Sequence, residues 1–89
     1  MRIDYSHHFL KCVARVPVSV QVALEKRVAL FAVDRRHPIL NVHPLHGHWR
    51  GFFSMNVTGD WRALYRNLGD GHVEWVEFTN IGTHSELYG

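Results

Sequence analysis

Histidine, aspartate and arginine side chains in the second half of the chain could together cleave RNA. Metal-independent cleavage needs a base for the ribose 2′-hydroxyl, an acid for the leaving 5′-oxygen and positive charge for the transition state. His43, Asp60 and His84 have side chains suited to proton transfer, and arginine is suited to binding phosphate. Composition alone is also consistent with an ordinary polar surface. The elements that position these residues must therefore distinguish a catalytic site from such a surface.

The histidines His43, His46 and His48 lie close together in the sequence and raise the alternative of a metal site. Their i, i+3, i+5 spacing is not a recognised zinc pattern, and no cysteine accompanies them. Pro44 and Gly47 also make this segment irregular. We therefore expect no metal and no other cofactor.

A helix-start signal near the end of the chain places His84. Thr83 followed three residues later by Glu86 has the form of a capping box, which predicts a short helix ending near Tyr88. His84 is then the first helical residue, where the positive helix end favours a neutral imidazole. A neutral imidazole can accept a proton, whereas Thr83 and Glu86 are interpreted as caps only.

Arginine and tryptophan side chains could bind the RNA itself. On a predicted strand over residues 61–66, alternation places Arg62 and Arg66 on one face and apolar residues on the other. If the apolar face packs on helices, both arginines project from the free face and could bind phosphate together with Arg50. Trp61 directly follows a turn and Trp49 lies in a loop, so either could stack on a base. The alternatives are a solvated charged face and a tryptophan in the core.

The elements that would hold these residues follow from hydrophobic periodicity and from turn residues. Alternation predicts a strand over residues 1–6, and helical spacing predicts two helices separated by Pro17, the second roughly over Val18–Arg36. Residues 39–50 are expected to form a loop or an edge. Three further strands, joined by short turns and therefore antiparallel, are predicted over residues 52–57, 61–66 and 72–79.

These elements predict an α+β fold. An N-terminal strand and a helical hairpin pack on a mainly antiparallel four-stranded sheet, followed by a short C-terminal helix, with residues 1–89 as one domain. One sheet face is left free for function, and Trp75 is expected in the core.

Length and composition limit the class of protein. The 89 residues carry a net charge of +2, and eight of the ten basic residues are arginine. The longest apolar run, Val28 to Val33, is too short to cross a membrane, and no secretory signal is visible at the start. Cys12 is the only cysteine, which suits a reducing compartment. We expect a cytoplasmic protein.

Three segments in order resemble YafQ-type toxins of the RelE/ParE superfamily, which belong to type II toxin–antitoxin systems. Residues 43–51 resemble the segment HPLxGxWxG, residues 60–65 resemble the strand DW…IY, and residues 82–89 resemble the C-terminal GTHxxLFG. The resemblance covers about half of the chain and implies a RelE-like fold. It also implies a ribonuclease that cuts mRNA on the ribosome and is inhibited by a cognate antitoxin protein.

Carried over by position, the resemblance implies roles for single residues. His43, Asp60 and His84 fall where these toxins place acid–base and positioning groups. Trp61 and Tyr88 fall at positions associated with the active site, with Tyr88 in place of a phenylalanine.

Two positions depart from the family pattern. Asn56 stands where YafQ-type toxins carry another catalytic histidine, and Asn80 stands where they carry an arginine. We infer that Arg62 or Arg66 could supply the missing charge from the neighbouring strand. Two alternatives remain open: a non-enzymatic toxin on the same fold, such as a ParE-like gyrase poison, or a degenerate toxin that only binds its antitoxin.

Overall fold

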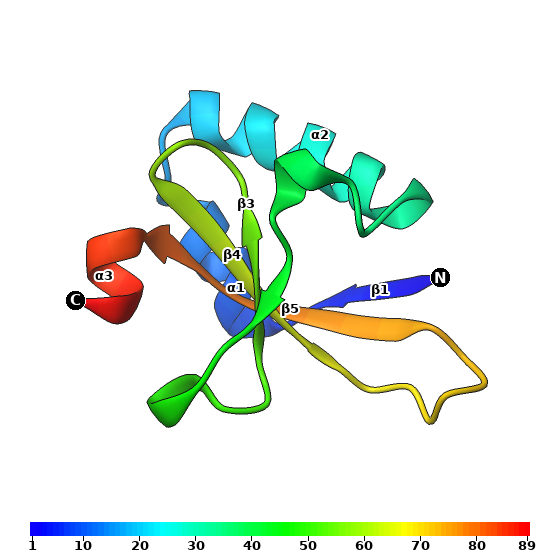
Figure 1. Ribbon diagram of the computed structural model, residues 1–89. Helices are drawn as coiled ribbons and strands as arrows, with labels where there is room; N and C mark the ends of the chain where they lie inside the picture. Colours follow the sequence, from blue (N-terminus) through cyan, green and yellow to red (C-terminus); the bar gives the residue numbers. More distant parts are fainter.

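A computed structural model describes all residues from 1 to 89, and it contains three α-helices and one sheet (Figure 1). The main elements are β1 (Arg2–Tyr5), α1 (His7–Val13), α2 (Val18–Val33), β3 (Phe53–Asn56), β4 (Trp61–Asn67), β5 (Trp75–Thr83) and α3 (His84–Tyr88). Three short elements lie between α2 and β3, namely the 3₁₀ turn η1 (Pro38–Leu40), strand β2 (His43–Pro44) and the 3₁₀ turn η2 (Gly47–Trp49).

The sheet has five strands in the order β1-β5-β4-β3-β2. β1 runs parallel to β5, and the other neighbours are antiparallel. The predicted α+β fold is confirmed, but the expected count of four strands is wrong, because residues 43 and 44 add a short strand at one edge. Pro44 lacks a backbone N–H and is compatible with this position because an edge strand has one unpaired side.

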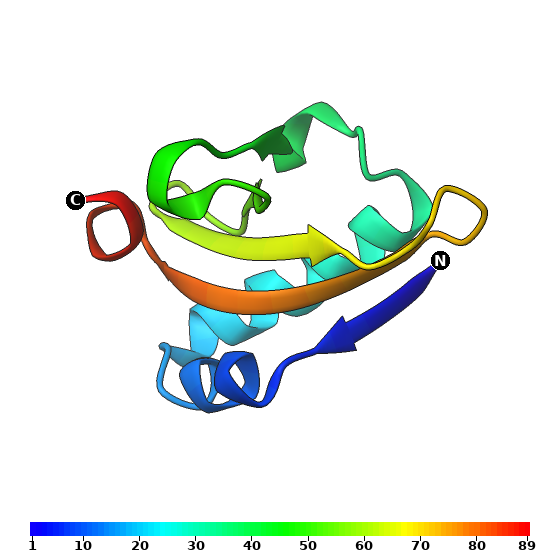
Figure 2. The ribbon, with the colours of Figure 1, turned by 90° about the horizontal axis from the view of Figure 1, so that it is seen from below.

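The two N-terminal helices cover one face of the sheet. Val20, Leu24 and Phe31 are buried on α2, as helical spacing predicted, and Phe9 is buried on α1. They pack on residues of β3, β4 and β5, and a bulge between Phe78 and Asn80 in β5 interrupts the strand alternation. These strand residues are Met55, Ala63, Tyr65, Val76, Phe78 and Ile81. In Figure 2 α2 lies behind β4 and β5, and the opposite face of the sheet, called the open face below, is turned toward the viewer.

Helix α2 ends earlier than predicted. It ends at Val33, and Asp34 leaves the helical conformation with φ −150° and ψ 85°. The Asp34 carboxylate accepts a hydrogen bond from the Arg36 backbone N–H at 3.2 Å, which competes with helical bonding. Arg35 and Arg36, expected in the last helical turn, therefore lie in the loop beyond it.

Strand β5 is displaced toward the C-terminus relative to the predicted range. It begins at Trp75 rather than at residue 72, because the Asp70 carboxylate binds the His72 backbone N–H at 3.0 Å and forms a turn. At its other end it continues to Thr83 and leads directly into α3. The long strand thereby carries His84 to the far end of the sheet.

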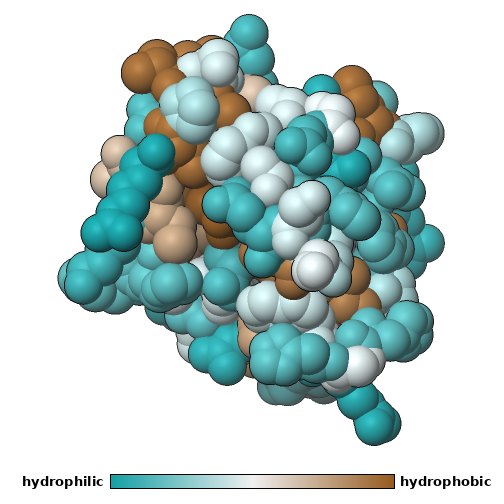
Figure 3. Space-filling view, turned by 90° about the vertical axis from the view of Figure 1, so that its left-hand side faces the viewer, coloured by the Kyte–Doolittle hydropathy of each residue, from teal (hydrophilic) through white to brown (hydrophobic).

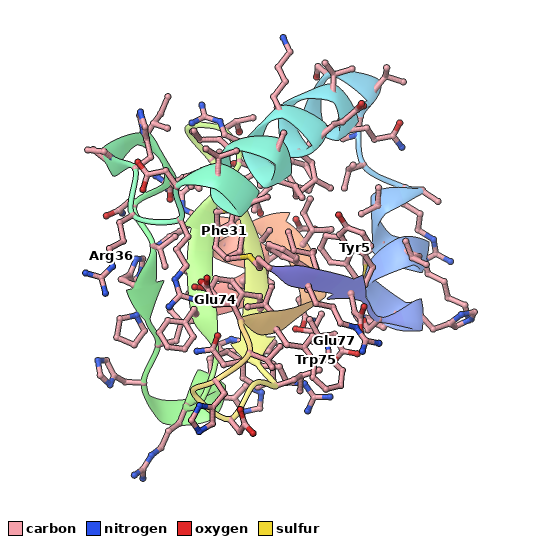
Figure 4. All side chains as sticks on the ribbon, turned by 90° about the vertical axis from the view of Figure 1, so that its right-hand side faces the viewer. Tyr5, Phe31, Arg36, Glu74, Trp75 and Glu77 are labelled. Atoms are coloured by element: carbon pink, nitrogen blue, oxygen red, sulfur yellow. The ribbon has the colours of Figure 1, made fainter.

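Trp75 is not in the core, contrary to expectation. It is half-buried on the open face, where its indole Nε1–H donates to Asp4 at 2.9 Å and Arg2 lies over its ring at 4.3 Å. Figure 4 shows the Trp75 and Glu77 side chains on the side of the sheet opposite to Phe31. No helix of the protein is long and apolar enough to cross a membrane.

Candidate active site

Cross-strand pairing aligns residues of four strands on the open face. Residues that face each other in register project from the same side of a sheet. One row crosses β2, β3, β4 and β5 and consists of His43, Ser54, Leu64 and Asn80. The next row toward α3 consists of Asn56, Arg62 and Gly82.

The start of α3 brings His84 next to Asp60. The His84 backbone N–H donates to the Asp60 carbonyl at 3.0 Å, so the β3–β4 turn and the helix start are joined. The predicted capping box is confirmed: Thr83 Oγ1 accepts from the Glu86 N–H at 3.2 Å, and Glu86 Oε1 accepts from the Thr83 N–H at 2.8 Å. This backbone hydrogen bond lowers the pKa of Glu86. His84 is exposed at the first helical position, as predicted.

Tyr88 connects His84 to the sheet. Its ring contacts the His84 ring edge to face, with centroids 4.9 Å apart. Its hydroxyl donates to Ser54 Oγ at 2.9 Å, and Ser54 is fully buried in β3. Because Ser54 is the register partner of His43, the four side chains His84, Tyr88, Ser54 and His43 form a contiguous group, called the His–Tyr group below.

The imidazole of His43 is fixed in one tautomer. His43 Nδ1 lies 2.9 Å from the Asn41 carbonyl, which can only accept a hydrogen bond, so Nδ1 carries the proton. In the neutral ring Nε2 is then left as a free acceptor. Asn41 has a left-handed backbone, with φ 45°, and this conformation directs its carbonyl toward His43.

Arg62 presents an unneutralised positive charge beside this group. Its Nη1 donates to the carbonyls of Thr58, Gly59 and Trp61 at 3.0–3.2 Å, and its Nη2 donates to Gly59 at 3.2 Å. No carboxylate lies within 4.0 Å of it, since the ion pairs of the protein involve other arginines. Four bonds to main-chain oxygens therefore hold the guanidinium in place without cancelling its charge.

Arg66 occupies a different part of the open face. Its Nη2 and Nε lie 2.9 and 3.0 Å from Glu77 Oε1, so it forms an ion pair. It lies four residues from Arg62 along β4, at the end of the sheet remote from α3. The structure thus separates two arginines that the sequence placed together on one face.

Trp49 and the loop between β2 and β3 hold α3 against the sheet. The Trp49 indole Nε1–H donates to the Leu87 carbonyl at 2.9 Å, and its ring packs edge to face on Phe52. Gly82 allows the close approach of α3, because a Cβ at this position would lie 3.2 Å from Leu87 Cγ. On the side of the molecule shown in Figure 3 most of the surface is hydrophilic, and hydrophobic residues gather toward the helical layer.

The remaining predicted site residues lie outside the His–Tyr group. Trp61 packs against the core on the helical face of the sheet. Arg50 is exposed at the end of η2, where no ion pair or side-chain hydrogen bond holds it. Asp60 reaches the group through its backbone, and its exposed carboxylate is free of protein hydrogen bonds.

Sequence reasoning missed Ser54, and it offered Trp49 only as a loop residue that could stack on a base, whereas the structure uses its indole to hold α3. Ser54 gives no local signal, because a serine within a strand is ordinary until its partner from the end of the chain is known. The signal that could have assigned Trp49 to the site is its position within residues 43–51, the segment that resembles the toxin family.

The two departures from the family pattern both lie on the open face. Asn56 is paired with Arg62 across β3 and β4, and its Oδ1 is buried without a hydrogen-bond partner. Asn80 lies in the row of His43 and Ser54. No three His, Cys, Asp or Glu side chains of the protein lie close enough together to bind a metal ion.

Comparison with known proteins gives matches among solved structures. YafQ from E. coli strain BL21(DE3) is 26% identical and superposes with a TM-score of 0.78 over 100% of both chains. A YoeB/ParE toxin from Agrobacterium tumefaciens is 17% identical, with a TM-score of 0.74 over 94% of this chain and 99% of the other. The RelBE2 toxin–antitoxin complex of Mycobacterium tuberculosis matches at 24% identity and a TM-score of 0.65, over 93% and 96% of the two chains. No protein-family profile and no curated protein sequence matches the chain.

The chain therefore shares the fold of RelE/ParE-superfamily toxins. Among these structures it is similar to YafQ over its whole length, which agrees with the three sequence segments noted above.

Proposed function

We propose that this protein is the toxin of a type II toxin–antitoxin system and cleaves mRNA on the ribosome by metal-independent acid–base chemistry. The observation that carries the proposal is the His–Tyr group lying beside the unpaired charge of Arg62. Two imidazoles and one free guanidinium on an accessible face meet the needs of RNA transesterification.

In this reaction the 2′-oxygen attacks the adjacent phosphorus and the 5′-oxygen leaves. One proton passes from the 2′-hydroxyl to a base, and one passes from an acid to the leaving oxygen. His84 and His43 divide these two transfers, since His43 offers a free Nε2 and His84 lies exposed at a helix start. Asp60, joined to His84 through the backbone, assists as a third titratable group.

Arg62 supplies the positive charge for the phosphorane-like transition state in this proposal. Its guanidinium is already oriented by main-chain carbonyls, so little reorganisation is needed when charge develops on the phosphate. It thereby takes the place of the family arginine that Asn80 replaces. Tyr88 positions His84 through its ring, and Arg50 and Trp61 are assigned to more distant RNA contacts, whereas the charge of Arg66 is engaged by Glu77.

The partners follow from the same proposal. DinJ–YafQ from E. coli and RelBE2 are toxin–antitoxin complexes, and we infer that this chain likewise binds a cognate antitoxin protein. Its substrate complex is the ribosome with mRNA, and its site of action is the cytoplasm.

Induced expression in a bacterial host tests the proposal, with the wild type and the His84→Ala variant compared at equal protein levels. We expect growth arrest and cleaved mRNA with the wild type, and normal growth with the variant. Unimpaired growth and intact mRNA in cells that contain well-expressed wild-type protein would refute it.

A second candidate is a non-enzymatic toxin on the same fold, such as a gyrase poison. It is favoured by Asn80, which leaves the row of His43 without a cation. This function predicts DNA damage and filamentous cells with intact mRNA. A degenerate toxin that only binds its antitoxin predicts complex formation without toxicity, so the same cultures distinguish all three.

A further inference from the structure

A basic hollow lies beyond the end of α2, on the helical side of the sheet. It has a volume of about 570 Å³ and opens between the α2–η1 loop and the strands β3 and β4. The rings of Phe53 and Tyr65, stacked with centroids 5.3 Å apart, form part of its wall. Its polar lining consists of Arg35, Arg36, His37, Asn41 and Asn67, and no carboxylate lines it.

The two arginines give the hollow a net positive charge. Arg36 is exposed and has no carboxylate within 4.0 Å, and Figure 4 shows it pointing away from Glu74. Arg35 has one distant ion pair, 3.8 Å to the exposed carboxylate of Glu74, which lies outside the hollow. The Asp34 carboxylate accepts from the Arg36 backbone N–H and is also outside the lining.

The other polar groups add hydrogen-bond donors. His37 Nδ1 accepts from the Ile39 N–H at 3.2 Å, so the proton of the neutral ring is on Nε2, which is a donor. Burial raises the pKa of the Tyr65 phenol, and the positive charge of Arg35 opposes this rise. The chemistry of the lining therefore fits an anion.

The hollow adjoins the His–Tyr group across the edge of the sheet. The Asn41 carbonyl accepts the hydrogen bond that fixes His43, and Phe53 directly precedes Ser54 in β3. The two sites are separated by β2, a strand of two residues with no further strand beyond it. An RNA chain that leaves the open face at His43 can pass around this edge and enter the hollow.

We propose that the hollow binds a backbone phosphate of the RNA substrate, a short distance along the chain from the phosphate that is cleaved. Arg35 and Arg36 are the ligands, and His37 Nε2 is an additional donor. This inference rests on the proposed function and adds to it a second contact that sets which bond reaches His43 and His84.

Binding measurements on a protein unable to cleave test this inference. In a His84→Ala background, the double variant Arg35→Gln/Arg36→Gln and the single variant Arg36→Gln are compared with Arg15→Gln/Lys26→Gln. The control removes two positive charges that are exposed elsewhere and form no ion pair. Affinity for a labelled single-stranded RNA is measured by fluorescence anisotropy over a range of salt concentrations, and thermal unfolding verifies that each variant is folded.

We expect the double variant to bind RNA more weakly and to show a salt dependence reduced by about 0.7 for each lost phosphate contact. The control should retain the affinity and slope of the parent. Inorganic phosphate should shift the backbone NMR signals of residues 35–41 in the parent and not in the double variant. Arg36→Gln, altered only at an exposed side chain, should show part of the loss.

Three results would overturn the inference. One is equal RNA binding by the double variant and the control. Another is a response of residues 35–41 to inorganic phosphate but not to RNA, which would assign a small-anion site. The third is a response to a polyglutamate peptide but not to RNA, which would assign an acidic protein partner. This experiment measures RNA binding and does not need cleavage. If the wild type binds RNA through the hollow but cleaves no mRNA, the proposed function alone is contradicted.

Discussion

Replacing Arg62 by glutamine, with Arg66→Gln as the matched control, tests the proposed chemistry most directly. The two arginines lie on the same strand and the same face, and both variants lose one charge. Their environments differ, because Arg62 is held by main-chain carbonyls and Arg66 is paired with Glu77. Only Arg62 has a charge that remains available to a phosphate.

The expected magnitude follows from these environments. Removing one preorganised group that stabilises transition-state charge costs about 2.7–4 kcal/mol, or roughly 10²–10³ in rate. Arg62 is half-buried on an open face, so solvent screening places its effect toward the lower limit, about 10²-fold. Arg66→Gln breaks an exposed ion pair worth about 0.2–1 kcal/mol of stability and should leave the cleavage rate unchanged.

Single-turnover cleavage of a labelled mRNA on purified ribosomes measures both rates. Arg62→Lys is included because lysine keeps the charge but not the planar fork, so its rate should lie between those of the wild type and Arg62→Gln. Thermal unfolding of each variant separates loss of rate from loss of folded protein. If Arg62→Gln cleaves as fast as Arg66→Gln, the assignment of the charge to Arg62 is wrong.

Four further predictions concern the support of α3. Thr83→Ala should cost about 1 kcal/mol of stability through loss of the cap, measured by chemical denaturation. Because the folded pKa of Glu86 is lowered, its contribution is complete above its usual pKa near 4.5 and disappears as pH falls below it. The protection factor of the Thr83 amide against hydrogen exchange should decrease as pH falls through this range, whereas in Glu86→Gln the protection factor should stay constant. Tyr88→Phe should cost about 1 kcal/mol, since buried Ser54 loses its partner, yet retain cleavage because the ring remains; a rate loss as large as that of Tyr88→Ala would contradict this. Trp49→Phe should accelerate amide exchange in α3 by removing its indole hydrogen bond, and unchanged exchange would show that this bond does not hold the helix.

Local signals predicted the parts of the fold that neighbouring residues determine. The capping box at Thr83 and the apolar face of α2 were both confirmed, because each depends on contacts within one or two helical turns. The segment of β2 was predicted only as a loop or an edge, since two residues become a strand only through pairing with β3. The end of α2 was misplaced because the Asp34 side chain competes with the helix, a local effect that periodicity does not detect.

Candidate members of the site could be named from the sequence, but their arrangement could not. The family resemblance selected His43, Asp60 and His84, and the structure gathers them at one end of the sheet. Sequence could not separate Arg62 from Arg66, because the carboxylate that engages Arg66 lies on another strand, 11 residues along the chain. Ser54 was missed for the same reason, since its partner Tyr88 is 34 residues away.

The two asparagines that depart from the family pattern flank Arg62, and this placement bears on how charge is supplied. Asn56 pairs directly with Arg62, and Asn80 lies on the neighbouring strand at the diagonal position, about 7–8 Å away or somewhat less between Cβ atoms. An arginine at position 80 would set two like charges side by side, and a histidine at position 56 would add a third when protonated. With asparagine at both positions Arg62 is the only permanent cation of these two rows, so no neighbouring charge repels it from the His–Tyr group. Within the proposed function, the positive charge of the site lies on β4, at Arg62, instead of on β5, at position 80. The asparagines at positions 56 and 80 depart from the catalytic residues of the family, but they also leave Arg62 without repulsion from a neighbouring cation.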